Sequence, residues 1–112
     1  MRQVQDALRP TGISAFAGAW KPTVEHPEAP ERYIVYTTMR TEDEHWDDAY
    51  RNYRVYVYLN LWIMDDPTES ARAIREAMHA AGFSMSDERD SYNADTRQTL
   101  IAWTWVGSLE AD

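Results

Sequence analysis

The sequence predicts a single α+β domain over residues 1–112, in which one main helix covers one face of an antiparallel sheet of about four strands. A capped helix signal lies in the middle of the chain, with a pair of strand-like segments on each side of it. Neither pair has room between its strands for a crossover helix, so both pairs are expected to form antiparallel hairpins. The expected order of elements is therefore α-β-β-α-β-β.

A short helix and an irregular arm are expected before the first strand. Apolar residues recur at helical spacing in residues 1–9 and stop at Pro10, which cannot continue a helix. Residues 10–32 contain prolines and glycines at short intervals, so we expect an irregular arm that lies across a surface of this chain or of a neighbour. The α+β core is then expected in residues 33–107.

Two strands are expected between the arm and the main helix. Residues 33–39 are rich in β-branched and aromatic side chains, and residues 52–64 alternate in the manner of a strand. One side of the second strand is an ordinary core face, and the other side is amphipathic and aromatic. The core side holds Val55, Val57, Leu59 and Leu61, and the aromatic side holds Arg54, Tyr56, Tyr58, Asn60 and Trp62.

The main helix has a recognisable start and end. Asp66 is expected to be its N-cap, Pro67 its first helical residue, and Glu69 the residue that reaches back to the cap. Apolar residues then recur at helical spacing as far as residue 81, and Gly82 is expected to end the helix.

Two further strands are expected after the helix, one beginning at Phe83 and one in residues 98–106. In the last strand both sides are largely apolar, so it is expected to be central or covered on both faces. One side holds Ile101, Trp103 and Trp105, and the other holds Leu100, Ala102, Thr104 and Val106. Because the main helix hides one face of the sheet, the aromatic second face needs another cover, for which a neighbouring subunit is the simplest choice.

The charge balance argues against a protein that grips nucleic acid. The 11 Lys and Arg residues are outnumbered by 19 Asp and Glu residues, which gives a net charge of −8. A protein that binds the phosphate backbone needs a basic surface to displace counterions, so we expect no tight binding of nucleic acid. The chain also has no cysteine for a disulfide or thiolate site, and no apolar stretch approaches the ~20 residues of a membrane span.

Residues 41–48, between the first two strands, form a polar loop with five carboxylates and no Lys or Arg. They are Glu42, Asp43, Glu44, Asp47 and Asp48. The loop lacks the alternating ligands and the mid-loop glycine of a calcium-binding EF-hand. Three interpretations stay open: an ordinary solvated loop, a cation site, and an acidic surface that is positioned within a ring.

Five aromatic residues form the candidate subunit interface. They are Tyr56, Tyr58, Trp62, Trp103 and Trp105. Tyrosine and tryptophan are over-represented at protein interfaces, but some of these side chains are also expected to complete the core of the domain. Stacking on single-stranded nucleic acid would require interleaved basic residues, and Arg54 alone does not supply them.

No catalytic, metal-binding or cofactor-binding motif is recognised in the sequence. The three histidines have no helical metal-ligand spacing, no Gly-x-Ser-x-Gly turn is present, and four glycines leave little material for a phosphate-binding loop. We therefore expect no enzymatic activity and no cofactor. A small hydrolase or isomerase is kept as the enzymatic alternative.

Several short motifs resemble those of the tail terminator and tail-completion proteins of long-tailed phages. The first motif is AAGFSMSD in residues 80–87, where the main helix is expected to end. The second is DSYNADT in residues 90–96, which leads into the final apolar strand. Pro30, shortly before the first strand, is similar to the start of the family's fold. The resemblance covers about residues 30–107, and it leaves the 10–32 arm unmatched.

The resemblance implies a structural role in the virion. Such proteins assemble as rings, usually hexameric, on the head-proximal end of the tail tube, where they stop tube growth and join the tail to the head-side connector. The implied partners are further copies of the chain, the tail tube protein and the connector, and DNA passes through the channel. The protein would reside in the host cytoplasm before assembly. The alternative is a generic ferredoxin-like α+β adaptor or small-ligand-binding domain.

Overall fold

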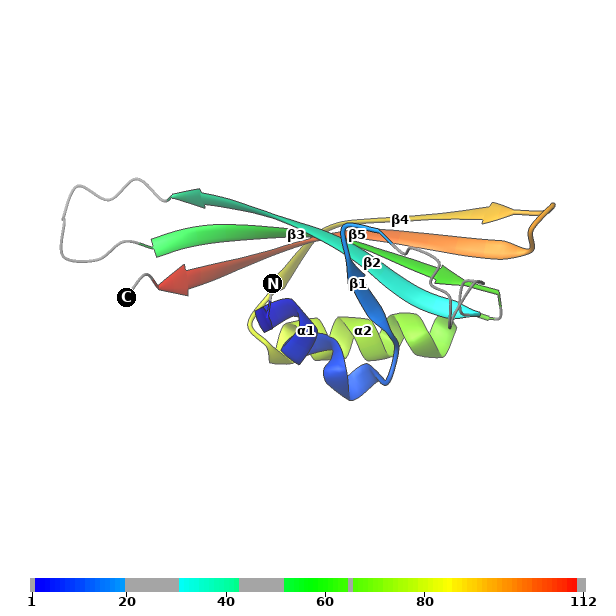
Figure 1. Ribbon diagram of the computed structural model, residues 1–112, viewed down its shortest axis with the longest axis horizontal. Coiled ribbons are helices and arrows are strands. Elements are labelled where there is room, and N and C mark those ends of the chain that lie inside the picture. Colours follow the sequence, from blue (N-terminus) through cyan, green and yellow to red (C-terminus); the bar gives the residue numbers. More distant parts are fainter. Residues whose placement is uncertain (1, 20–30, 43–51, 65, 111–112) are drawn as a thin grey trace, which may run out of the picture.

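The computed structural model describes residues 2–19, 31–42, 52–64 and 66–110. Two helices and a five-stranded sheet make up this part of the chain, in agreement with the predicted α+β class (Figure 1). In chain order the elements are α1 (Arg2–Leu8), η1 (Arg9–Thr11), β1 (Ala15–Ala17), β2 (Arg32–Glu42), β3 (Asn52–Ile63), α2 (Thr68–Ala80), β4 (Ser84–Asn93) and β5 (Gln98–Glu110).

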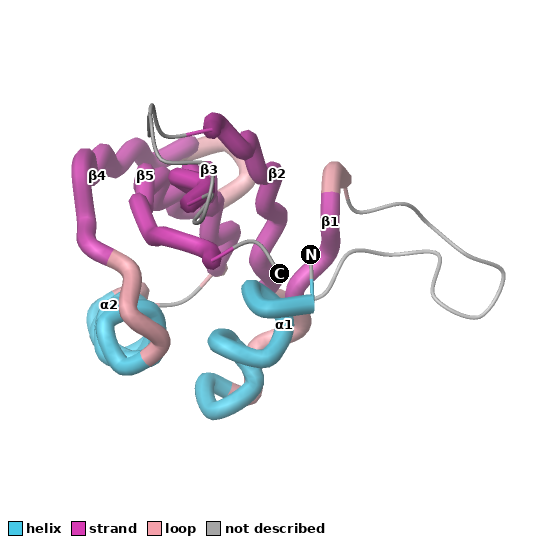
Figure 2. Tube along the Cα trace, turned by 90° about the vertical axis from the view of Figure 1, so that its left-hand side faces the viewer, coloured by secondary structure: helices cyan, strands magenta, loops and turns pink. Residues whose placement is uncertain are grey.

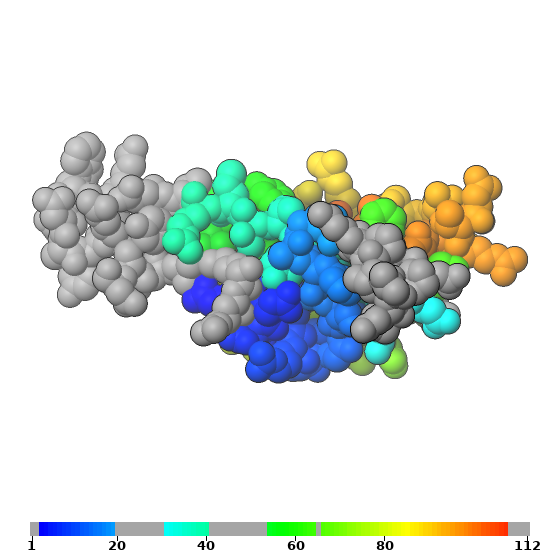
Figure 3. All heavy atoms as spheres, viewed as in Figure 1, coloured from blue at the N-terminus to red at the C-terminus, as the bar shows by residue number. Residues whose placement is uncertain are grey.

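The sheet has the strand order β1-β2-β3-β5-β4. The pairs β2–β3, β3–β5 and β5–β4 are antiparallel, as the sequence predicts. Both helices lie on the same side of the sheet, which leaves its other side without a helix (Figures 1 and 2). Figure 3 shows the β4–β5 end of the sheet, in orange, projecting at one end of the molecule.

The fifth strand corrects the prediction of an irregular arm in residues 10–32. Ala15–Ala17 forms β1, which runs parallel to β2 and pairs with its residues Ile34 to Tyr36. A strand of three residues is too short to show alternation in a sequence, and its pairing depends on a partner edge that only the folded sheet supplies. Residues 20–30 of the predicted arm lie outside the described residues.

The helix α2 begins at Thr68, one residue later than predicted. Asp66 nevertheless acts at its start, because one carboxylate oxygen accepts hydrogen bonds from the Thr68 backbone N–H at 3.0 Å and from the Thr68 hydroxyl at 2.6 Å. Pro67 supplies the carbonyl for the first helical hydrogen bond, from the Ala71 N–H at 2.8 Å. The prediction that Asp66 serves the start of the helix is therefore confirmed, but Pro67 takes the N-cap position and, among the described residues, no side-chain hydrogen bond from Glu69 closes a capping box.

The end of α2 is as predicted. Gly82 has a φ of +92° and donates its N–H to the His79 carbonyl, and Phe83 donates to the Met78 carbonyl, both at 3.0 Å. This pair of hydrogen bonds is a Schellman cap. It turns the chain so that the buried Phe83 ring lies against Gly107 of β5, where an added Cβ would come within 2.6 Å of the ring.

The hydrophobic core lies between the helices and the sheet. The predicted core side of β3 is confirmed, because its four residues are at most 1% exposed. Residues from each strand β2, β3 and β5 meet residues from both helices in one cluster. The cluster includes Val4, Leu8, Ile34, Tyr36, Val55, Val57, Leu59, Leu61, Ile74, Met78, Ile101, Trp103 and Trp105.

Candidate interaction surfaces

The side of the sheet that faces away from the helices is the main candidate surface. Residues that lie directly opposite one another in neighbouring strands share a face. In β3 and β5 the pairs Tyr56–Val106, Tyr58–Thr104, Asn60–Ala102 and Trp62–Leu100 lie on this side. We call it the open sheet face. Over β2, β3 and β5 it comprises Tyr33, Val35, Thr37, Met39, Arg54, Tyr56, Tyr58, Asn60, Trp62, Gln98, Leu100, Ala102, Thr104 and Val106.

Aromatic rings form a continuous row across one end of the open sheet face. Phe16 of β1 packs edge-on against Tyr33 at 6.3 Å between ring centroids, and Tyr33 stacks on Trp62 at 6.4 Å with 17° between the ring planes. Partial burial in this row raises the pKa of the Tyr33 phenol above its ordinary value, so the group stays neutral. The row offers a broad and uncharged surface that spans three strands.

The open sheet face carries few charges for a chain of this composition. Of its fourteen positions, all with described side chains, one is charged, namely Arg54, whereas 27% of the whole chain is charged. Met39 and Tyr58 on this face are 45% and 40% exposed. Charges return on the edge strand β4, where Asp87 and Arg89 lie opposite Thr104 and Ala102. An apolar and aromatic surface with little charge, bordered by charged residues at one edge, is typical of a surface that is covered in an assembly.

Two of the five predicted interface residues lie elsewhere. The structure brings Tyr56, Tyr58 and Trp62 together on the open sheet face, but it places Trp103 and Trp105 in the core beneath the helices, 2% and 0% exposed. The cause is the register of β5, which sets Trp103 opposite Leu59 and Trp105 opposite Val57. Because both sides of this strand are apolar, its alternation alone could not show which side faces the helices.

A polar cluster that sequence reasoning missed joins α2 to the edge of the sheet. One carboxylate oxygen of Glu88 accepts hydrogen bonds from Arg75 Nε at 3.0 Å, from Arg75 Nη2 at 2.7 Å and from the Trp103 indole N–H at 2.7 Å. The hydrogen bonds from Arg75, followed by the one from Trp103, hold the pKa of Glu88 below its ordinary value despite partial desolvation. The cluster fixes a core tryptophan and an edge strand, and its role is therefore structural.

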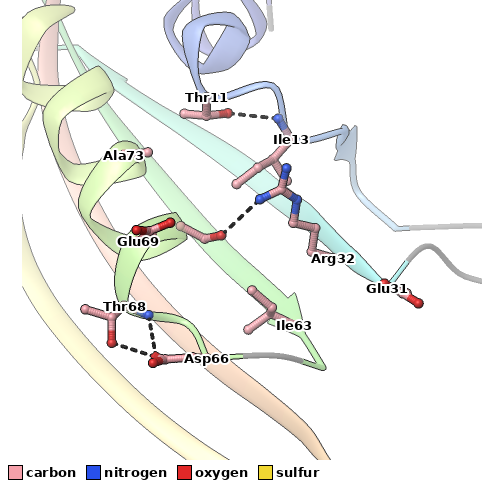
Figure 4. A pocket seen from close by; sticks show the side chains of 10 residues that line it. Thr11, Ile13, Glu31, Arg32, Ile63, Asp66, Thr68, Glu69 and Ala73 are labelled. Carbon is pink, nitrogen blue, oxygen red and sulfur yellow. Dashed lines mark hydrogen bonds between the residues drawn. The ribbon is translucent and has the colours of Figure 1, made fainter.

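A groove of about 890 Å³ lies beside the N-terminal end of α2 (Figure 4). We call it the α2 groove. Its walls come from η1, from the start of β2, from the end of β3 and from the first turns of α2. The described residues that line it include three carboxylates, Glu31, Asp66 and Glu69. The Arg32 guanidinium also lines it and donates to the buried Ser70 hydroxyl at 3.4 Å.

The acidic loop was predicted from Glu42, Asp43, Glu44, Asp47 and Asp48. Glu42 is the last residue of β2, and residues 43–48 lie outside the described residues. Within the described ranges, no cluster of three or more His, Asp or Glu side chains is arranged to hold a metal ion. No helix in the same ranges is long and apolar enough to cross a membrane.

Comparison with known proteins gives a likeness of fold. No family model matches the sequence, and no curated protein matches it. Among solved structures, a chain from the virion of a native gene transfer agent particle is similar, with a TM-score of 0.60 and 10% sequence identity. The match covers 98% of this chain and 90% of the other, so the likeness extends over the whole fold.

Proposed function

We propose that this chain is a structural subunit of a phage-like virion, and within it a tail terminator or tail-completion protein. The subunits form a ring, with six copies as the expected number, on the head-proximal end of the tail tube. The ring ends tube growth and joins the tail to the head-side connector. Its partners are other copies of the chain, the tail tube protein and the connector protein.

The observation that carries this proposal is the open sheet face. It is aromatic, almost free of charge and half-exposed in a chain whose net charge is −8. A surface of this kind gains free energy when another protein covers it, at roughly 25 cal/mol per Å² of apolar area. The full-length likeness of fold to a chain of a gene transfer agent virion supports a role in a particle of the same kind.

The mechanism is assembly, without a chemical step. Tyr56, Tyr58 and Trp62 contribute the rigid aromatic contacts that dominate the binding energy of interfaces. One end of the ring matches the last ring of the tube and the other matches the connector, so that no further tube ring is added. The acidic loop from Glu42 to Asp48 is proposed to line the channel, where its charge repels passing DNA.

Replacement of Tyr58 by glutamate tests the assembly. Tyr58 is 40% exposed on the open sheet face, so Tyr58→Glu is expected to keep the circular dichroism spectrum and to lower the yield of rings, because it would bury an unpaired charge. Ring yield is measured by native mass spectrometry and negative-stain imaging, with and without tail tubes. The matched control is Met85→Glu, since Met85 is 41% exposed but lies opposite Trp105, on the helix side.

Two outcomes would contradict the proposal. The first is a wild-type chain that stays monomeric when tail tubes are added, which would favour an adaptor or ligand-binding domain. The second is a Tyr58→Glu variant that assembles as well as the Met85→Glu control. Trp103→Glu is unsuitable as an interface variant, because Trp103 is 2% exposed and its replacement would disrupt the core.

A further inference from the structure

We propose that the turn between β4 and β5 of one copy docks into the α2 groove of a second copy, with Arg97 placed against the groove's carboxylates. The contact is head-to-tail, because the turn and the groove are different surfaces of the same chain. It rests on the proposed function, and it adds a second contact between successive copies of the ring, beside the one made by the open sheet face.

The turn is a projecting element. In Figure 1 the β4–β5 end of the sheet extends past the end of α2. The residues from Asn93 to Arg97 are all exposed, and the Asp95 N–H donates to the Asn93 side-chain oxygen at 3.0 Å, which holds the turn. Arg97 is the last residue before β5 and has a φ of +58°, in the left-handed region that favours glycine.

The groove is a receiving surface of opposite charge. Among the described residues that line it, the carboxylates Glu31, Asp66 and Glu69 outnumber the cations, of which there is one, Arg32. The hydrogen bonds that Asp66 accepts from Thr68 lower the pKa of its carboxyl, so this residue remains ionised. The groove has a volume of about 890 Å³.

The charges of the two surfaces are complementary. Arg97 has a long side chain and five N–H donors that suit a carboxylate, and the groove offers three carboxylates. Asp95, the acidic residue of the turn, finds its counterpart in Arg32. The rest of the chain is strongly acidic, so a site where a cation meets carboxylates directs two like-charged copies toward one arrangement.

The positions of the two surfaces suit a closed ring. The β4–β5 turn and the N-terminal end of α2 lie toward the same end of the molecule (Figure 1). The turn belongs to β4 and β5, at one edge of the sheet, whereas the groove lies on the helix side, between η1, the start of β2, the end of β3 and the first turns of α2. The turn and the groove are therefore separate surfaces near one end of the molecule, and the same contact repeated from copy to copy would be heterologous, the kind that can close into a ring.

The left-handed conformation of Arg97 makes one variant unusually informative. Arg97→Gly removes the side chain and relieves its backbone, so the monomer is expected to melt at a higher temperature than wild type. The same variant is expected to form fewer rings, because the docking cation is gone. A variant that is more stable and yet assembles less well would show that Arg97 acts in docking. If Arg97 served only to stabilise the fold, stability and assembly would not change in opposite directions.

Charge reversal tests the pairing directly. Arg97→Glu is expected to lower the ring yield by about tenfold or more, and the added change Glu69→Arg in the same chain is expected to restore most of it. The control is Arg72→Glu, because Arg72 is an exposed arginine of α2 that does not line the groove. Ring yield is measured by native mass spectrometry with tail tubes present. Wild-type yield for Arg97→Glu, or no recovery in the double variant, would overturn the proposed contact.

Cysteine cross-linking separates this contact from the ring itself. The chain has no cysteine, so Thr96→Cys in the turn and Ala73→Cys in the groove introduce one thiol each. Mixed copies are expected to cross-link through a short bis-maleimide, whereas Thr96→Cys mixed with Ala80→Cys, at the other end of α2, is not. Rings that form without the first cross-link would refute the docking and leave the proposed function intact. A wild-type chain that forms no ring would refute both.

Discussion

At the scale of single residues, the two core tryptophans differ in how their indole N–H groups are satisfied. The Trp103 N–H donates to Glu88 at 2.7 Å, whereas the Trp105 Nε1, in the described part of the chain, is buried without a hydrogen-bond partner. Trp105 is also fully buried, with the His79 ring packed edge-on against it at 5.2 Å. One tryptophan therefore links the core to the sheet edge, and the other contributes through apolar packing.

Replacement of each tryptophan by phenylalanine tests this difference. Both variants lose a similar buried volume, so the loss of stability caused by the cavity is about the same in each and cancels when the two are compared. Trp103→Phe also removes a hydrogen bond to a charged acceptor, and it is expected to lower the free energy of unfolding by about 1–3 kcal/mol more than Trp105→Phe. Urea denaturation of the two variants gives the comparison. Equal losses would mean that the bond to Glu88 contributes nothing to stability.

Glu88 also predicts how stability depends on pH. Its carboxyl has an ordinary pKa of 4.5, which the hydrogen bonds from Arg75 lower in the folded chain. The ionised form therefore stabilises the fold fully above pH 4.5, and this contribution is lost as the pH falls through the lowered pKa. Melting temperatures between pH 3 and 6, measured in steps of roughly half a unit, are expected to fall less steeply for Glu88→Gln than for wild type. Parallel curves for the two proteins would contradict this assignment.

At the scale of elements, the start of α2 depends on the hydrogen-bond acceptor that the Asp66 side chain provides, more than on the negative charge of that side chain. Asp66 caps the first turn through hydrogen bonds from the Thr68 N–H and hydroxyl. Asp66→Ala removes the acceptor and is expected to lower the melting temperature by a few degrees, whereas Asp66→Asn keeps an oxygen there and is expected to retain most of the stability. Thermal denaturation followed by circular dichroism measures both. An alanine variant that melts with the wild type would show that the cap is dispensable.

The edge strand β4 shows how an exposed strand is kept from pairing at random. All ten of its residues are exposed, and it pairs with β5 alone among the described strands. A bulge between Met85 and Asp87 interrupts its register, and charged residues follow from Asp87 to Asp90. Bulges and charges are common protections of sheet edges. Contacts between copies are therefore expected through the open sheet face and the β4–β5 turn more than through the β4 backbone.

At the scale of the whole molecule, the acidic loop gives a test of the proposed channel. The variant changes Glu42, Asp43, Glu44, Asp47 and Asp48 to the corresponding amides. Folding and ring assembly are expected to be unchanged, while DNA leaves the particles more slowly, most visibly at low salt, because the channel no longer repels phosphate. The release of DNA is followed by dye fluorescence at two salt concentrations. Unchanged release at low salt would place the loop away from the DNA path.

Much of the fold could be predicted because the signals are local. The alternation of residues 52–64, the turn from Asp66 to Thr68 and the Gly82 cap depend on residues close in sequence, and the structure contains each of them. The short strand β1 and the Glu88 cluster could not be predicted in the same way. Each is formed between segments distant in the chain, and neither leaves a periodic pattern.

The candidate interface shows the same division between sequence and tertiary structure. The residues of β3 by themselves determine that an aromatic side opposes an aliphatic core side, because alternate residues of a strand point to opposite faces. Which side of β5 joins the aromatic side is decided by the pairing of Trp103 with Leu59 and of Trp62 with Leu100. This register depends on which face of the sheet the helices cover. The residue pattern of a strand that is apolar on both sides does not indicate which side will face the helices.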